Sequence, residues 1–483
     1  MSTLHQIHVN SEIGRLRRLI IHSPDAGLGK VIPSKAQDWL FEDIIHLETM
    51  RSKEYDLYVK LLLYFLDPEK VKGKLLEIDA PENNRSFYKP GSKAYFNSDK
   101  VLDPQSLLAD ILQEKDVRDR LVAAVCAYED VSYGVEMELL KMPAFELANA
   151  LISGILPDNR MIFPPVPNFI FTRDIAVVVN KHIMLTKPAT RARSRERILT
   201  TYIMFNHEIF KDYKDKIVEI TNTEDHFLYD SDEKASKTVS LEGGDVMTVA
   251  PNHLLIGLSE RTSLHAVSKV IQELFAKDVV EKVSVIKIPN KRAFMHIDTT
   301  FTQVKRNLWV IHAPFSKKHI YYATRDLIPA LGEPKELFTV DITQFHKDKV
   351  DEPIKFEFLE DLLDDISRND LKSKVETEFI YSGDGVFPFG QREQWTDSCN
   401  VLALKEGVVI AYDRNDKTAE GFRKKGFAVV HAATLIEQLD KDKVSADALE
   451  NTLILLPSAE LSRARGGSHC LSMPLLRDNV FIT

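Results

Sequence analysis

Five side chains that could do chemistry stand in short motifs spread along the sequence. Cys470 lies in G-G-S-H-C-L, Asp174 ends F-I-F-T-R-D, Glu242 begins E-G-G-D, and H-I-D contains His296 and Asp298. Residues two apart in a strand share one face, so we expect His296 and Asp298 to project together. A thiol, a histidine and several carboxylates are the parts of an activated nucleophile with its acid/base partner.

The number of carboxylates indicates the charge of the substrate. A site for acyl transfer needs hydrogen-bond donors around an oxyanion, not a ring of acids. Carboxylates around a thiol instead suit a cation, above all a planar guanidinium held by paired hydrogen bonds. Glycine pairs at 243–244 and 466–467 allow either a close backbone approach or a positive φ beside these residues.

Each motif also has an ordinary structural explanation. A lone H-x-D is more often structural than catalytic, a Gly-Gly pair is usually a turn, and a buried cysteine is ordinarily a small apolar residue. We expect Cys126 and Cys399 to pack in the core, and His22 to be structural. The same acids could ligate a divalent ion, but the sequence has no H-E-x-x-H or C-x-x-C, so we predict no metal.

Composition limits the partners and the location. The 483 residues carry a formal net charge of -9, which argues against nucleic acid or an anionic membrane as the main partner. Three cysteines are too few, and odd in number, for a disulfide framework. The start of the chain lacks the apolar segment of a signal peptide, and no apolar run reaches 18 residues. We therefore predict a cytoplasmic protein.

The sequence shows two patterns of apolar residues, one helical and one of alternating strands and helices. Residues 35–66 and 102–156 have helical periodicity, and the second segment reads as a small helical subdomain. After residue 157, short apolar runs alternate with helical stretches, which predicts repeated strand–helix units. The expected strands are 16–24, 175–179, 182–185, 253–258, 283–288, 308–313 and 407–412. The expected helices are 193–211, 263–276, 357–367 and 417–425.

Taken together and in order, the motifs resemble those of the arginine deiminase family, in the guanidino-modifying (pentein) superfamily. The matching segments are 11–24, 40–44, 167–174, 241–245, 255–262, 296–299, 391–397 and 458–474. The resemblance implies an α/β fold, a five-bladed propeller of ββαβ units with a helical insertion. It places the propeller at 1–100 and 157–483, and the insertion at 101–156. It also implies that no cofactor is needed.

The resemblance assigns roles residue by residue. Cys470 is the expected nucleophile, and Asp174 and Asp298 are expected to hold the guanidinium nitrogens. His296 is expected to protonate the departing ammonia and then activate water, with Glu242 orienting it. The implied substrate-binding residues, which include three arginines suited to an α-carboxylate, are Asn168, Phe171, Arg193, Asp245, Arg261 and Arg465.

The implied reaction converts L-arginine and water to L-citrulline and ammonia. The alternatives are the same mechanism on another guanidino or ureido amino acid, an amidinotransferase, or a non-catalytic arginine-binding regulator. His469 precedes the nucleophile where many family members have arginine, which leaves the substrate open. We also expect a homo-oligomer, and the role of insertions near 67–100, 227–240 and 345–390 is open.

Overall fold

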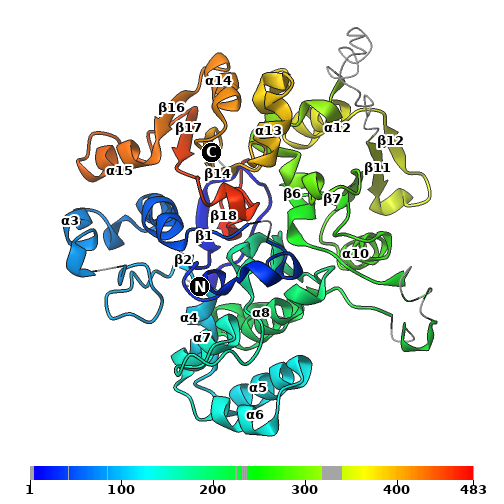
Figure 1. Ribbon diagram of the computed structural model, residues 1–483. Coiled ribbons are helices and arrows are strands. Elements are labelled where there is room, and N and C mark those ends of the chain that lie inside the picture. Colours follow the sequence, from blue (N-terminus) through cyan, green and yellow to red (C-terminus); the bar gives the residue numbers. More distant parts are fainter. Residues whose placement is uncertain are drawn as a thin grey trace.

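Five mixed β-sheets organise the molecule. The computed structural model describes residues 5–41, 43–83, 85–223, 226–230, 232, 234, 237–317 and 340–481. Figure 1 shows the strands toward the middle of the molecule and most helices toward its edge. The predicted insertion at 227–240 lies partly outside the described residues.

Each sheet is built on three strands, and two sheets are extended at one edge. The first sheet contains β1 (Leu16–Ile20), β2 (Val101–Leu102) and β18 (Met473–Arg477). The second contains β3 (Ala176–Val179), β4 (His182–Leu185) and β5 (Ile217–Glu219). The third contains β6 (Val246–Ala250), β7 (His253–Leu258), β8 (Lys282–Lys287), β11 (Asp341–His346) and β12 (Ile354–Phe356). The fourth contains β9 (Phe301–Lys305), β10 (Leu308–Ile311) and β13 (Glu378–Tyr381). The fifth contains β14 (Leu402–Lys405), β15 (Val408–Tyr412), β16 (Ala428–His431) and β17 (Thr452–Leu456).

The same connection recurs in all five sheets. A first strand pairs antiparallel with a second, which pairs parallel with a third after a crossover: β3–β4–β5, β6–β7–β8, β9–β10–β13 and β14–β15–β17. In the remaining sheet the first strand is β18, from the far end of the chain, followed by β1 and β2. Parallel neighbours need a long crossover, and helices supply it. The predicted ββαβ repeat and its fold class are confirmed.

Helices occupy the crossovers and the outer surface. The helices before the second half of the chain are α1 (Leu47–Thr49), α2 (Asp56–Leu66), α3 (Leu75–Ile78), α4 (Pro104–Ile111), α5 (Lys115–Glu129), α6 (Tyr133–Leu140), α7 (Ala144–Ser153) and α8 (Ser194–Asn206). The later ones are α10 (Leu264–Ala276), α12 (Leu359–Asp365), α13 (Phe389–Trp395), α14 (Asp416–Lys424) and α15 (Ala432–Asp440). None of the helices in the described part of the chain has the length and apolar character needed to cross a bilayer.

Five apolar clusters join each sheet to the next. Strand side chains alternate between two faces, and both faces are buried here: Val177 packs toward the third sheet, and Val178, its neighbour in β3, toward the first. Further clusters join the third sheet to the fourth and the fourth to the fifth. The last cluster contains Leu402 of β14 and Leu19 of β1, so the fifth sheet packs against the first.

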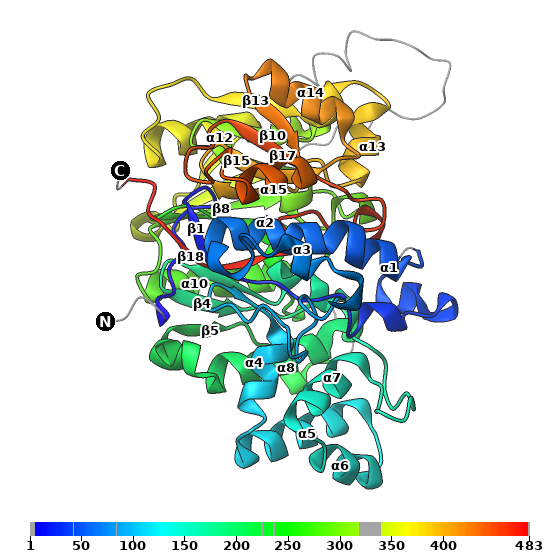
Figure 2. The same cartoon turned by 90° about the vertical axis from the view of Figure 1, so that its left-hand side faces the viewer.

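The segment 101–156 is helical, as predicted, except at its start. Residues 101–102 form β2, which pairs with β1, and helices α4 to α7 follow. Cys126 is buried on α5, in agreement with the predicted core position. Figures 1 and 2 both place α5 and α6 at the outer edge of the molecule. The division of the chain into domains stays a prediction.

The continuous helix expected from residue 35 is wrong. Leu40 takes a left-handed backbone with φ of 67°, which ends the preceding 3₁₀ turn and directs Phe41 into the core. A new helix starts only at Leu47, where the His46 side chain accepts a hydrogen bond from the Thr49 amide. Periodicity alone did not reveal this interruption, because the apolar residues Ala36, Leu40, Ile44 and Leu47 keep a helical spacing in the sequence.

Candidate active site

Tight turns at the start of the first strand of four units carry the functional side chains. Asp174 precedes β3, Glu242 precedes β6, His296 precedes β9 and Cys470 precedes β18. The repeated connection puts these turns at the same end of their sheets. Four residues separated by up to 296 positions in the sequence therefore meet in one place.

A small, closed pocket lies where the turns meet, with a volume of about 30 Å³. Nine of the eleven residues predicted for the site line it: Asn168, Phe171, Asp174, Arg193, Glu242, Arg261, His296, Arg465 and Cys470. Four further residues complete the lining: Leu40, Arg292, Met295 and Ala464. The volume is far below the roughly 300–1,000 Å³ of most ligand sites, so a substrate must displace something.

The ring of His296 has a carboxylate near each of its two nitrogens, and the Gly244 backbone lies close to it. Its Nε2 lies 2.9 Å from Glu242 Oε2, and its Nδ1 lies 3.9 Å from Asp174 Oδ1. Burial alone would lower the pKa of His296, but Asp174, Glu242 and Asp245 raise it to about 10. A Cβ on Gly244 would come within 2.5 Å of His296 Nδ1, so the glycine is needed for close approach.

Arg193 fills the pocket with a guanidinium. Its Nη1 donates to Asp174 Oδ2 at 2.7 Å and to Glu242 Oε2 at 3.3 Å. Its Nε and Nη2 donate to Glu196 Oε2 at 3.0 and 2.9 Å. Burial would raise the pKa of Glu242, but Arg193 and the hydrogen bond from His296 hold it well below its usual range. The pocket thus holds a guanidinium against Asp174, which was predicted to bind the substrate guanidinium, and against Glu242, which was predicted to orient His296.

The thiol of Cys470 is buried among acids. Its Sγ lies 3.5 Å from Asp298 Oδ2, and its amide donates to Asn400 Oδ1 at 3.0 Å. Burial raises the pKa of Cys470 well above its usual value, and the charges of Asp298, Asp174 and Asp397 raise it further. The thiol is therefore neutral at pH 7, and a positive charge placed next to it would favour the thiolate.

Asp298 lies behind the thiol and does not line the pocket. Its Oδ2 also faces His469 Nδ1 at 2.9 Å, and His469 Nε2 faces Glu12 Oε2 at 3.1 Å. Burial would raise the pKa of Asp298, but the hydrogen bond to His469 lowers it. His469, the residue that departs from the family pattern, thus joins the acid beside the nucleophile to a second buried acid.

Asp245 is buried outside the pocket. Its carboxylate accepts hydrogen bonds from Ser259 Oγ and Thr262 Oγ1, both at 2.6 Å, and from the Ile297 amide at 3.0 Å. These bonds tie the turn before β6 to the loop that carries Arg261 and to the turn that carries His296. Its contacts in the unliganded protein are structural, and its predicted contact with substrate stays a prediction.

Two arginines approach the pocket from other segments. Arg261 Nη1 lies 3.8 Å from Glu242 Oε1. Arg465 has a left-handed backbone with φ of 64°, and its guanidinium carbon lies 3.4 Å from the centre of the Trp395 ring. The left-handed bend ahead of the nucleophile is thus at Arg465. Gly466 and Gly467 serve close packing, against Phe171 and Asn400.

Three groups in the pocket are spaced as metal ligands could be. Ligand atoms of Asp174, Glu242 and His296 lie within 4.8 Å of one another. The positive charge among them in this structure is the Arg193 guanidinium, which already satisfies an oxygen of each carboxylate. The arrangement gives a reason for the acids that requires no ion.

Several residues that line or support the pocket were not predicted from the sequence. Arg292 and Met295 line the pocket from the segment before His296, and Glu196 pairs with Arg193 from within α8. Glu12 and Asn400 act on His469 and Cys470 from other parts of the chain. Only the short spacing of Arg292 and Met295 from His296 offered a signal.

The fold and the pocket together define a class of protein: an α/β repeat protein in which a buried thiol, an imidazole and paired carboxylates surround a guanidinium. Comparison with known proteins identifies the family. The model of the family described as arginine deiminase matches residues 129–477. The chain belongs to the arginine deiminase family.

Relatives in this family match over the full length. The arginine deiminase of Oenococcus oeni is 29% identical over 487 residues, which cover 98% of each chain. That of Treponema denticola is 29% identical over 481 residues, covering 98% of this chain and 99% of the relative. Among solved structures, the amidinotransferase SxtG of Microseira wollei is 13% identical with a TM-score of 0.47, and covers 98% of both chains.

Proposed function

We propose that the protein hydrolyses L-arginine to L-citrulline and ammonia through a covalent intermediate on Cys470. The observation that carries the proposal is the Arg193 guanidinium, seated on Asp174 and Glu242 beside His296. A pocket that already accommodates a guanidinium beside a thiol suits a substrate that ends in one. Full-length similarity to the arginine deiminases of Oenococcus oeni and Treponema denticola supports the same substrate.

Binding begins with the displacement of Arg193. The guanidinium of the substrate replaces it on Asp174. Asp298 does not line the pocket as it stands, but its buried Oδ1 has no hydrogen-bond partner in the described part of the chain and takes a second pair of nitrogens once Arg193 has left. Arg261 and Arg465, with Asn168, line the pocket and hold the α-carboxylate. The guanidinium carbon of the substrate must lie next to Cys470 Sγ for the reaction, so its positive charge offsets the acids that raise the pKa of Cys470, and the thiol releases its proton to solvent when substrate binds.

In the first half-reaction the Cys470 thiolate forms an S–C bond to the guanidinium carbon. His296, whose pKa is raised to about 10, is protonated at neutral pH and gives its proton to the departing nitrogen. The C–N bond breaks, ammonia leaves, and an amidino group remains on sulfur. Glu242 holds the imidazole in place through the 2.9 Å contact.

In the second half-reaction water takes the place of ammonia. His296, now neutral, removes a proton from the water as its oxygen bonds to the amidino carbon. The C–S bond breaks, the thiolate returns, and the hydroxyl on carbon gives up its remaining proton, which leaves with ammonia as ammonium, as it becomes the carbonyl of citrulline. The sum is one arginine and one water consumed for one citrulline and one ammonia.

The test is a product assay on the purified protein with L-arginine, alongside Cys470→Ala. Equal amounts of citrulline and ammonia from the wild type, and none from the variant, are expected. A protein that binds arginine, labels at Cys470 with an alkylating reagent and yields no citrulline would overturn the proposal. Citrulline, methylated arginines and amine acceptors would then be assayed in turn.

The proposal extends to assembly and location. We place the protein in the cytoplasm, which suits three buried, unpaired cysteines. We propose that it is a homo-oligomer, because exposed apolar side chains gather on one segment, where Val386, Phe387 and Phe389 are 52%, 70% and 41% exposed. Light scattering after size exclusion tests this, and a mass of one chain would contradict it.

A further inference from the structure

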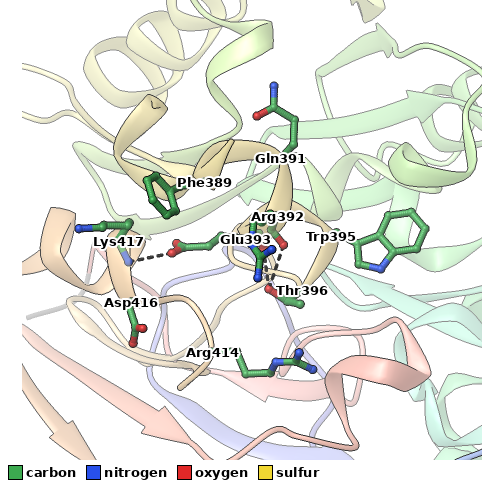
Figure 3. Close-up of a pocket in the computed structure, with 9 residues that line it drawn as sticks. All are labelled: Phe389, Gln391, Arg392, Glu393, Trp395, Thr396, Arg414, Asp416 and Lys417. Atoms are coloured by element: carbon green, nitrogen blue, oxygen red, sulfur yellow. Dashed lines mark hydrogen bonds between the residues drawn. The ribbon is translucent and has the colours of Figure 1, made fainter. Parts of the chain in front are cut away.

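A second, larger pocket opens over the end of α13, outside the active site. Its volume is about 610 Å³, enough for a small organic molecule. Figure 3 shows Phe389 and Lys417 toward one end, Trp395 at the other, and Arg392 with Thr396 between them. Its lining shares no residue with the catalytic pocket.

Three cations line this pocket, in a protein whose net charge is -9. Arg414 Nη1 donates to Ser462 Oγ at 2.7 Å and so is fixed by neutral groups. The Lys417 ammonium lies 5.6 Å from the centre of the Phe389 ring. In the part of the chain that the structure describes, none of Arg392, Arg414 and Lys417 forms an ion pair.

The buried acid in the lining does not neutralise these cations. Glu393 accepts hydrogen bonds from the Lys417 and Thr418 amides, both at 2.8 Å, and from Thr418 Oγ1 at 2.6 Å. It thereby caps the first turn of α14. Asp416 is the remaining carboxylate of the lining. The lining therefore has three positive side chains and one carboxylate that does not cap a helix.

Two aromatic rings give the pocket an apolar wall. Phe389 is 41% and Trp395 is 42% exposed, although rings of this size are normally more deeply covered. Trp395 is already stacked on Arg465 through one face. Exposed rings beside unpaired cations form a surface that complements a planar, negatively charged molecule.

We propose that this pocket binds an aromatic anion, that is, a planar ring that bears a phosphate or a carboxylate. Arg392 and Lys417 bind the anionic group, with Arg414 at the edge, and Phe389, which lies beside Lys417, takes the ring. The site is separate from the catalytic pocket, and it adjoins that pocket through the stacking of Trp395 on Arg465.

The test is a calorimetric titration of the full chain with phenyl phosphate, benzoate and inorganic phosphate. We expect one site per chain for phenyl phosphate or benzoate, and the tighter of the two identifies the anionic group. Inorganic phosphate should bind at least fivefold more weakly than phenyl phosphate if the latter binds, because it has no ring. Saturable binding of neither aromatic probe overturns the proposal.

Variants locate the binding. The double variant Arg392→Gln/Lys417→Gln should weaken binding at least tenfold, and Phe389→Ala should reduce the advantage of the ring. Lys424→Gln is the matched control, since Lys424 lies on the same helix but is paired with Asp384 at 2.6 Å. Unchanged affinity in the double variant overturns the proposal, because the binding then lies elsewhere.

Discussion

Two buried histidines of this protein have similar partners and opposite chemistry. His296 faces Glu242 at 2.9 Å, and His253 faces Asp370 at 2.7 Å. His253 also faces Ser284 Oγ at 2.8 Å, so serine, histidine and aspartate stand in the order of a hydrolase triad. Residue types and hydrogen-bond lengths therefore do not distinguish the histidine proposed as catalytic from the one that lies outside the pocket.

Charge balance and access do distinguish them. Burial lowers the pKa of His253, and Lys282 counters the effect of Asp370. Around His296 the acids prevail, and its pKa rises to about 10. His253 and Ser284 are completely buried, whereas His296 lines a pocket with the thiol. A catalytic group needs surplus charge and space for a substrate, and His253 has neither.

The largest expected difference is in catalysis. Replacing His296 by asparagine removes the acid and base, so kcat should fall by roughly 10²–10⁴-fold. The same change at His253 should leave kcat within about threefold, because His253 does not line the catalytic pocket. Citrulline formation measures both, and circular dichroism checks that each variant is folded. An equal loss of kcat in the two variants would contradict the different roles proposed for His296 and His253.

The second difference is in stability. His253→Ala leaves the buried Asp370 without its neutral partner, and an unsatisfied buried group costs about 1–3 kcal/mol. For a protein of 483 residues we expect the unfolding midpoint to fall by roughly 1–3 °C. His265→Ala, at an exposed position on α10, is the control and should stay within about 0.5 °C. An unshifted midpoint in His253→Ala would mean that the buried network contributes little.

A third comparison concerns support from outside the pocket. Trp395→Ala removes the ring stacked on Arg465, and a cation–π contact is worth about 0.5–2 kcal/mol. We expect KM for arginine to rise roughly three- to tenfold with little change in kcat. Phe389→Ala, on the same helix, should change KM less than about twofold, and Trp395→Phe should restore most of the loss. The same KM in Trp395→Ala and the wild type would contradict a positioning role.

The smallest expected effect is in the pH dependence of unfolding. The folded-state pKa of His296 lies above its usual 6.5, so its stabilising contribution is full below pH 6.5 and is lost as pH rises toward 10. His253 has a lowered pKa, so its contribution is lost as pH falls below 6.5. Midpoints of His296→Asn should therefore fall less than the wild type above pH 7, and those of His253→Asn less below it. Parallel curves for all three proteins would contradict these shifts.

Many strands and helices could be predicted from the sequence, because burial of one face spaces the apolar residues regularly along each element. The apolar runs at β3, β4, β7 and β15 were located to within a residue or two, and the helices at α10 and α14 likewise. The interruption at Leu40 was not, because a left-handed residue with a large side chain leaves no compositional trace. Turns rich in glycine are visible in a sequence, and turns without glycine are not.

The site divides in the same way. Four of the nine lining residues, Asp174, Glu242, His296 and Cys470, were located by motifs in polar turns, and the other five only by resemblance to the family. The motifs did not locate Glu12, which is 457 positions from His469, its hydrogen-bond partner. The motifs also did not predict that Arg193 would bind Asp174 and Glu242. Several arginines lie nearby in the sequence, and packing decides which of them reaches a carboxylate.

The pairing of β18 with β1 has a consequence for synthesis. Every other sheet takes its first three strands from one stretch of chain, whereas the first sheet waits for a strand that the ribosome makes last. The same late segment carries Cys470. The first sheet therefore cannot be completed, and the thiol proposed as nucleophile cannot be put in place, until the end of the chain has been made. A chain that stops before residue 470 would lack both that thiol and the strand that follows it.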